Sequence, residues 1–330
     1  IGRLKRMRGG IILRKIIWFA LNILLMGILL EGCGSAANPA GTADKKENST
    51  VVIGLMPDTD SLPFIIAREK GFFAEEGVEV RLQPFKSAMD RDAALQSGNL
   101  DGAVSDLLAA AFAKAGGFNV KVTSRTDGSY RLVTAPAEGN ADLLALRGKE
   151  IAVSKNTIIE YVTDRILSAN QIFEGSVKKV VIPQIPTRLE LLQQSKLAAA
   201  TLPEPMGSIA VHNGCHYLVS SNEFGINPGI MLFTENAVKT KKDSLRAVYR
   251  AYNKAVRYLR ETPRAEYIDL AVEKSGFPPA AREALALPDY QEARLPSEKD
   301  VAECMAWLKE KNLIGQPYAY QELVTGDCLP

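Results

Sequence analysis

The sequence predicts an α/β protein of two similar lobes, each built on a mostly parallel sheet flanked by helices. From Val51 onward, short apolar strands alternate with amphipathic helices, which is typical of parallel sheets. The same pattern restarts after the Pro- and Gly-containing segment Ala135–Gly139. The composition agrees, since 46% of the 330 residues are hydrophobic and 24% are charged, which supplies a core for one or two domains.

Residues 1–32 are expected to be an export signal peptide. Six basic residues precede the apolar run Ile16–Leu30, which at about fifteen residues is too short to span a bilayer easily. A buried N-terminal helix is the alternative, and the lack of a polar face disfavours it. The tetrapeptide Leu30–Cys33 resembles the lipobox of bacterial lipoproteins, although Glu31 departs from the small residue preferred there. This predicts lipidation of Cys33 and a flexible tether over residues 33–50.

The net charge limits the possible binding partners, and the cysteine count limits the possible disulfides. Loss of residues 1–32 removes six of the 40 basic and one of the 38 acidic residues, which leaves a net charge of −3. A mildly acidic chain argues against nucleic acid as a partner. Three cysteines remain besides Cys33, namely Cys215, Cys304 and Cys328. Either Cys304 and Cys328 pair or all three are free buried thiols, and spacing alone does not distinguish these alternatives.

The first lobe is expected to contain five strands and three helices. Strands are predicted over Val51–Met56, Val78–Pro84, Asp101–Ser105, Val120–Ser124 and Arg131–Ala135. Helices are predicted over Leu62–Phe72, Ser87–Gln96 and Leu107–Ala115. Ser87 with Asp90 three residues later forms a capping box, which marks the start of the second helix.

The second lobe is expected to follow the same plan. Strands are predicted over Glu150–Val153, Val177–Ile182, Leu197–Thr201 and His216–Val219, and helices over Thr157–Ala169 and Thr187–Gln194. Both helices begin with a capping box, Thr157 with Glu160 and Thr187 with Glu190. Segments 96–105 and 194–201 share a helix end, a tight turn and a strand of small residues.

After a second boundary at Ser221–Gly229, one more strand, Ile230–Thr234, is followed only by helices. Apolar residues recur at helical spacing in Asp243–Glu261 and Ser297–Lys311. We expect this helical tail to return to the first lobe.

Polar residues gather where predicted strands end and helices begin, which is where open α/β sheets bind ligands. Backbone N–H groups and side chains at helix starts can bind ligand oxygens. The candidate ligand-binding residues are Asp58, Asp60, Ser61, Ser87, Ser105 and Asp106 in the first lobe, and Ser154, Asn156, Thr157 and Glu204 in the second. Several of them are equally well explained as helix caps. Asp58 and Glu204 have the weakest capping explanation.

The sequence contains no common catalytic motif. It has no GxSxG elbow, phosphate loop, GxGxxG, HExxH or paired CxxC. His212 and His216 invite a metal-site interpretation, but Gly214 is expected to end a helix between them, so their rings would not share a helix face. We therefore expect no catalytic residue, no metal and no cofactor.

Four segments carry a family resemblance. Ile65–Val78, Ser97–Ala103, Leu202–Pro205 and Ala251–Ala255 resemble type II periplasmic binding proteins of the nitrate, sulfonate and taurine importer group, which includes thiamine-pyrimidine binders. The resemblance implies two lobes joined by two hinge crossovers, with residues 51–137 plus 229–330 in lobe 1 and 138–228 in lobe 2. It also implies a lipid-anchored monomer outside the cytoplasm of a bacterium, which captures a small-molecule solute for an ABC permease and its ATPase.

Within that group the residues favour one kind of solute. Asp58, Asp60, Asp106 and Glu204 load the candidate cleft with carboxylates, and Lys155 and Arg188 are the only cations nearby. This favours an amine or an aminopyrimidine-like solute over nitrate, a sulfonate or taurine. Phe64, Phe85 and Tyr161 are candidates for stacking on a heterocycle, or they belong to the core. Two other functions stay open: an enzyme of pyrimidine or menaquinone-precursor metabolism on the same fold, and a sensor or adhesin lipoprotein.

Overall fold

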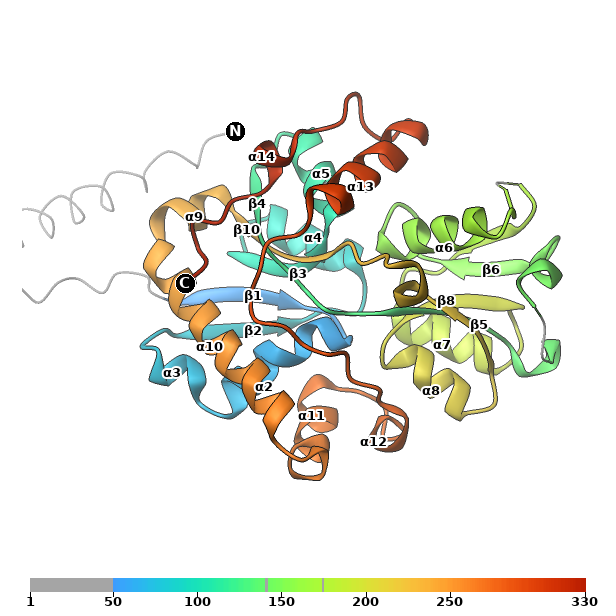
Figure 1. Cartoon of the computed structure of the whole chain (residues 1–330), viewed down its shortest axis with the longest axis horizontal. Helices are drawn as coiled ribbons and strands as arrows, with labels where there is room; N and C mark the ends of the chain where they lie inside the picture. The colour runs from blue at the N-terminus through green and yellow to red at the C-terminus, as the bar shows by residue number, and fades with distance from the viewer. Residues whose placement is uncertain (1–49, 140–141, 174) are drawn as a thin grey trace, which may run out of the picture. The chain divides into compact units, whose positions relative to one another are not determined.

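The computed structural model describes residues 50–139, 142–173 and 175–330. The predicted signal peptide, the lipidation of Cys33 and the tether to residue 49 lie outside the described residues. Two five-stranded sheets, which we call sheet A and sheet B, form the framework of the described chain (Figure 1). Among the described residues, no helix is long and apolar enough to cross a membrane.

Sheet A and sheet B have the same strand arrangement. Sheet A contains β1 (Val51–Leu55), β2 (Val80–Pro84), β3 (Gly102–Asp106), β4 (Val120–Arg125) and β10 (Gly229–Thr234) in the order β2-β1-β3-β10-β4. Sheet B contains β5 (Tyr130–Thr134), β6 (Glu150–Val153), β7 (Lys178–Val181), β8 (Ala199–Pro203) and β9 (His216–Ser220) in the order β7-β6-β8-β5-β9. The fourth strand in each order, β10 or β5, runs antiparallel to both neighbours.

The similarity predicted between segments 96–105 and 194–201 is confirmed in the two central strands. β3 and β8 occupy the same place in their sheets, and each follows a helix, α4 (Ala88–Gln96) or α7 (Ile185–Gln193). Both turns need a left-handed residue, Gly98 with φ of 79° and Ser195 with φ of 54°. The two turns therefore have the same left-handed backbone conformation, although only one has glycine there.

One strand lies in a different sheet from the one predicted. Tyr130–Thr134, which the boundaries above assign to lobe 1, pairs with β8 and β9 of sheet B. The chain therefore first crosses between the sheets at residues 126–129, not after residue 137. Strand pairing is non-local, so periodicity within the segment carries no information about its partner strands. The second crossing lies between the short helical turn Ser221–Phe224 and β10.

Two helix boundaries also differ from the predictions. The helix predicted over Leu62–Phe72 is two helices, α2 (Leu62–Glu69) and α3 (Phe72–Glu75), because Gly71 has φ of 78° and interrupts the first. α7 begins at Ile185 with Gln184 as its N-cap, so Thr187 is not the cap. Pro186 explains this, since proline favours the first turn of a helix.

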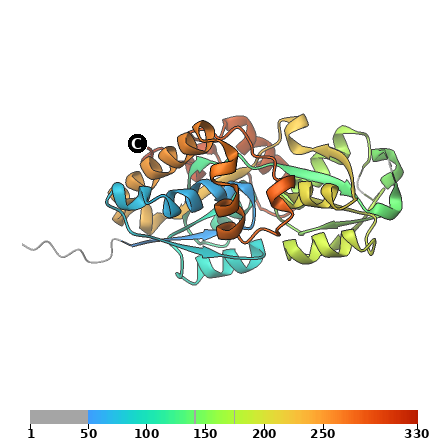
Figure 2. The same ribbon diagram turned by 90° about the horizontal axis from the view of Figure 1, so that it is seen from below.

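The remaining helices flank the sheets. They are α5 (Leu107–Ala115), α6 (Ile158–Ala169), α8 (Met206–His212), α9 (Glu235–Thr240), α10 (Lys242–Glu261), α11 (Ile268–Ser275), α12 (Ala281–Ala284), α13 (Glu298–Glu310) and α14 (Tyr320–Leu323). The long helix α10 packs along α2 and α3, as both views show (Figures 1 and 2).

The C-terminal helices return to sheet A as predicted, but they also contact helices that flank sheet B. α13 packs against α5 beside sheet A, and Val324 forms a bridge with Val122 of β4. α12 packs against α8, which flanks sheet B (Figure 2). The ring of Trp307 on α13 meets Tyr161 on α6 edge to face, at 5.6 Å between centroids. The tail therefore joins the two halves in addition to the crossings.

Candidate functional site

A small cavity of about 40 Å³ lies between the two sheets at the ends of their strands. Six of the ten predicted ligand-binding residues line it: Asp58, Asp60, Ser105 and Asp106 from the sheet A side, and Ser154 and Thr157 from the sheet B side. The loops around it are in direct contact, since the N–H of Thr59 donates to the carbonyl of Glu204 at 2.8 Å. A cavity of this size holds only a few water molecules, so a larger solute needs these loops to stand further apart.

The other four predicted residues lie near the cavity without lining it. Ser61 donates its hydroxyl to Asp58 at 2.9 Å, and Ser87 is the N-cap of α4. Asn156 has φ of 57°, and its N–H donates to Glu160 at 2.7 Å. Glu204 is ion-paired with Arg131 and accepts from the N–H of Ser208 at 3.1 Å. For these residues the structure shows capping or positioning contacts.

Asp58 and Asp60 form a buried carboxylate pair after β1. Burial, reinforced by the charge of Asp60, raises the pKa of Asp58 to about 7. Burial also raises the pKa of Asp60, whose Oδ1 accepts from the N–H of Gly128 at 2.8 Å. The hydroxyl of Tyr130 donates to Oδ2 of Asp60 at 3.4 Å. A cationic or donor-rich partner would restore the charged form of this pair.

Asp106 combines a capping role with exposure to the cavity. Its Oδ1 accepts from the N–H of Ala109 at 2.8 Å and caps α5. Burial raises the pKa of Asp106, while Arg91 and the N–H of Ile158 oppose the shift. Ile158 is the first residue of α6 beside sheet B, so the start of that helix faces a carboxylate of the sheet A side. The capping and ligand-binding interpretations of Asp106 are therefore compatible.

Two buried arginines line the cavity, Arg91 and Arg188, and only Arg188 is predicted from the sequence. Arg91 on α4 lies beside Asp92 at 2.8 Å and donates to the carbonyl of Val104 at 3.2 Å. Arg188 on α7 is fully buried. Lys155, the other cation named from the sequence, is exposed and is not among the lining residues. Arg91 was missed because it sits in the middle of a helix, away from the strand ends where ligand residues were expected.

The three aromatic residues considered for stacking on a heterocycle lie in different parts of the structure. Phe64 is buried against Tyr252 with 4.9 Å between ring centroids, and Tyr161 is buried against Trp307, so both belong to the core. Phe85 lines an adjoining pocket of about 360 Å³, together with Pro57, Pro186, Leu189 and Met206. Tyr130 is an aromatic residue of the small cavity itself. Tyr130 begins β5, and its place at the cavity depends on the pairing of β5 in sheet B, which the sequence does not predict.

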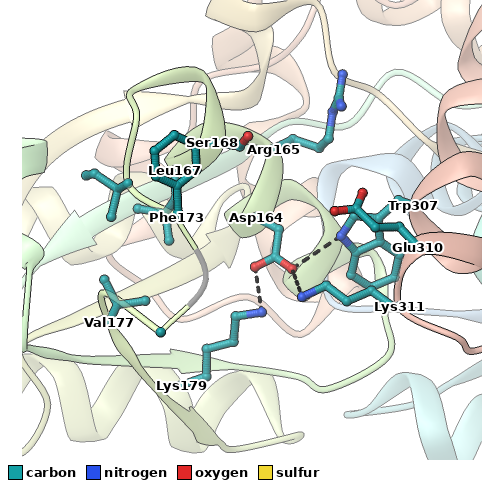
Figure 3. A pocket seen from close by; sticks show the side chains of 12 residues that line it. Asp164, Arg165, Leu167, Ser168, Phe173, Val177, Lys179, Trp307, Glu310 and Lys311 are labelled. Carbon is teal, nitrogen blue, oxygen red and sulfur yellow. Dashed lines mark hydrogen bonds and ion pairs between the residues drawn. The ribbon is translucent and has the colours of Figure 1, made fainter.

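A larger cavity of about 380 Å³ lies elsewhere, between α6 and α13 (Figure 3). Its central carboxylate, Asp164, accepts from the indole N–H of Trp307 at 3.2 Å and pairs with Lys179 and Lys311 at 2.5 and 3.0 Å. We assign the site to the smaller cavity because polar groups converge there from the strand ends of both sheets. In the larger cavity, Asp164 is instead already paired with Lys179 and Lys311.

The cysteines and histidines lie outside the site. Cys215, Cys304 and Cys328 are free and buried, and burial raises the pKa of each thiol, that of Cys215 to about 11. His212 ends α8 and His216 begins β9. Within the described part of the chain, no group of three or more histidine, cysteine or carboxylate residues is arranged to hold a metal ion.

The chain belongs to the NMT1-like family, whose model matches residues 44–272. No match was found among curated protein sequences. Solved structures of periplasmic binding proteins share its fold. The alkanesulfonate-binding protein SsuA of Xanthomonas axonopodis, bound to MOPS, is similar with a TM-score of 0.73 at 18% identity, over 84% of this chain and 99% of that one.

Two further structures give the same result. A ligand-binding component of an ABC-type import system of Staphylococcus aureus, with zinc bound, has a TM-score of 0.71 at 16% identity, over 85% of this chain and 98% of that one. The nitrate-binding protein NrtA of Synechocystis has a TM-score of 0.70 at 15% identity, over 86% and 87%. The predicted fold class, the two-lobed type II periplasmic binding protein, is therefore confirmed.

Proposed function

We propose that this protein is the solute-binding component of an ABC importer and works outside the cytoplasm. The observation that carries the proposal is the cavity lined from both sheets, with Asp58 and Asp106 on one side and Ser154 and Thr157 on the other. Solute between two walls is released when the walls separate, which suits delivery to a permease. The fold shared with import proteins supports the same function.

We further propose that the two halves move as lobes about the crossings. Lobe 1 would contain sheet A, and lobe 2 would contain sheet B and end at the second crossing. The first crossing, residues 126–129, contains Gly128 and contacts Asp60 in the cavity. A hinge needs only a few residues that change φ and ψ, and both crossings are short enough to serve. Solute binding and lobe position would then be linked through this segment.

The carboxylates support a solute with a cationic or donor-rich group, such as an amine or an aminopyrimidine. Asp58, Asp60 and Asp106 all have raised pKa values because they are buried. A bound cation offsets the cost of burying these charges. We also propose that Cys33 carries the lipid that holds the protein at a membrane, as a monomer, beside its permease and ATPase partners.

The proposal includes no catalytic step. A nucleophilic thiol needs a lowered pKa, and burial raises the pKa of Cys215 and Cys328 to about 11. This disfavours thiol chemistry and supports binding over the enzyme alternative. A sensor or adhesin would keep the cavity but would not restore uptake together with a permease.

The experiment identifies the small molecules released from the full chain, purified in detergent, by mass spectrometry, and then measures their binding by calorimetry. Asp58→Ala should weaken binding of the released solute by about 1–3 kcal/mol. The matched control is Asp243→Ala, because the side chain of Asp243 is fully exposed on α10. Absence of any released or bound solute would refute the proposal, and so would turnover of the solute into a product.

A further inference from the structure

Arg188 has an unusual environment for a charged residue. It is 0% exposed, on the wall of the small cavity that α7 provides. Its Nε donates to the carbonyl of Thr201 at 3.1 Å, and its Nη1 donates to the carbonyl of Ile182 at 2.7 Å. Its Nη2 is buried and has no hydrogen-bond partner in the structure. Two of the five N–H donors thus hold the side chain, and both N–H groups of Nη2 are left for another group.

The charge of Arg188 also lacks compensation. Burial alone lowers the pKa of Arg188 to about 10, so the guanidinium stays charged at neutral pH. Arg91, in the same cavity, is different, because Asp92, Asp106 and Asp58 all stabilise its charge. No carboxylate among the described residues has such an effect on Arg188. A buried charge without a counter-charge destabilises the folded protein, and a bound anion would offset that cost.

The opposite wall offers the complementary groups. Asp58, Asp60 and Asp106 provide carboxylates on the sheet A side. The hydroxyl of Ser105 is buried there without a hydrogen-bond partner. The sheet A side therefore presents three carboxylates beside one arginine, Arg91, and the sheet B side presents the guanidinium of Arg188. A solute that spans the cavity meets both.

We propose that the captured solute is zwitterionic, with an acidic group bound by Nη2 of Arg188 and a cationic amine bound by the carboxylates of Asp58 and Asp106. This inference rests on the proposed function and deepens it. It changes the preference drawn from the sequence, where the carboxylates alone favoured a solute with only a cationic group. The shared chemistry of the acidic group is that of a carboxylate or a sulfonate, both of which accept hydrogen bonds from a guanidinium.

Three matched compounds test the inference by calorimetry on the full chain. They are 3-aminopropanesulfonate, which carries both charges, propanesulfonate, which lacks the amine, and propylamine, which lacks the acid. The wild type should bind the first about tenfold or more tightly than either of the others, since each of the others lacks one of the two charge-assisted hydrogen bonds. Repeating the series with the corresponding aminocarboxylate, 4-aminobutanoate, distinguishes the two acidic groups.

Variants then identify the residue responsible. Arg188→Met should bind 3-aminopropanesulfonate no more tightly than propylamine, and Arg188→Lys should keep part of the difference. Arg257→Met, on the surface of α10, is the matched control and should leave all affinities unchanged. Because the comparison of compounds uses the wild type, it stands even if Arg188→Met fails to fold.

The outcomes separate this inference from the function it rests on. Equal binding of propylamine and the zwitterions by the wild type, or unchanged binding by folded Arg188→Met, would overturn the inference and leave solute capture intact. Failure of both zwitterions to bind would also overturn it. If, in addition, no small molecule is released from the wild type, the proposed function fails as well.

Discussion

The backbone N–H of Gly128 donates a hydrogen bond of 2.8 Å to Oδ1 of Asp60. Gly128 lies in the first crossing between the sheets, and Asp60 lines the cavity. The segment on which the two lobes would turn is therefore bonded directly to a proposed ligand-binding carboxylate. Because the donor is a backbone group, a change in φ or ψ in the crossing alters the position of Asp60 or breaks this bond.

Gly128→Ala should disrupt this contact. A Cβ at position 128 would lie 1.7 Å from Oδ2 of Asp60, so the carboxylate must move. We expect a loss of about 1–3 kcal/mol in the free energy of unfolding, together with weaker solute binding. Gly315→Ala is the control, because no atom lies within 4 Å of its Cβ position, and it should change stability by less than about 0.5 kcal/mol. Urea unfolding measures both variants, and equal stabilities would contradict the predicted clash.

Asp58 should make stability depend on pH. Its pKa is about 7 in the folded chain and 3.8 without the fold, so the folded state holds a proton that the unfolded state releases. Stability should therefore fall as pH rises through this window, and the loss should be complete above pH 7. Asp58→Asn removes this titration. Its free energy of unfolding, relative to that of the wild type, should therefore rise by about 1–3 kcal/mol between pH 5 and pH 8. Denaturant titrations at these two pH values measure the difference, and a constant difference would refute the assignment.

Local patterns predicted most of the secondary structure. The boundaries of α5 and β6 agree with the prediction at both ends, because apolar period, caps and turn residues act over only a few positions. The sheet membership of β5 was not predictable in this way. Its partners β8 and β9 lie about 70 to 90 residues further along the chain, and its own sequence is equally compatible with either sheet.

The candidate site was predictable only where local patterns determine it. Residues at strand ends, such as Asp58 and Asp106, follow from the rule that parallel strands place their carboxyl ends at one edge. Arg91 and Tyr130 reach the cavity from within a helix and from a strand of unforeseen pairing. Glu204 is a predicted ligand residue, but in the structure it is paired with Arg131, whose place in sheet B depends on β5. Contacts of this kind require the tertiary arrangement.

The lipid anchor is testable without knowledge of the solute. Cys33→Ser removes the thiol that a lipoprotein acylates, so the full chain should be released from membranes if its signal peptide is processed. Fractionation of expressing cells, with immunoblotting of soluble and membrane fractions, measures the distribution. Cys328→Ser is the control, since Cys328 is a buried free thiol near the other end of the chain. Persistent membrane association of Cys33→Ser would favour an uncleaved N-terminal helix.

The contact of Trp307 with Asp164 should stabilise the junction between α13 and α6 (Figure 3). Asp164→Asn removes the charge that pairs with Lys179 and Lys311, where the three side chains are only 16–18% exposed. We expect a loss of about 1–3 kcal/mol in the free energy of unfolding, because one partner of a largely buried ion pair disappears. Trp307→Phe keeps a ring beside Tyr161 and removes only the N–H, so it should cost about 1 kcal/mol.

The matched control for these two variants is Lys239→Ala. Lys239 is 69% exposed and pairs with Glu235 within α9, so its removal should cost no more than about 0.5 kcal/mol. Urea unfolding of the three variants gives the ranking. Because α13 packs beside sheet A and α6 flanks sheet B, a weaker junction should also let the lobes separate more easily. Small-angle scattering should then show a larger radius of gyration for Asp164→Asn than for Lys239→Ala, and identical stability and radius would show that this junction does not hold the halves together.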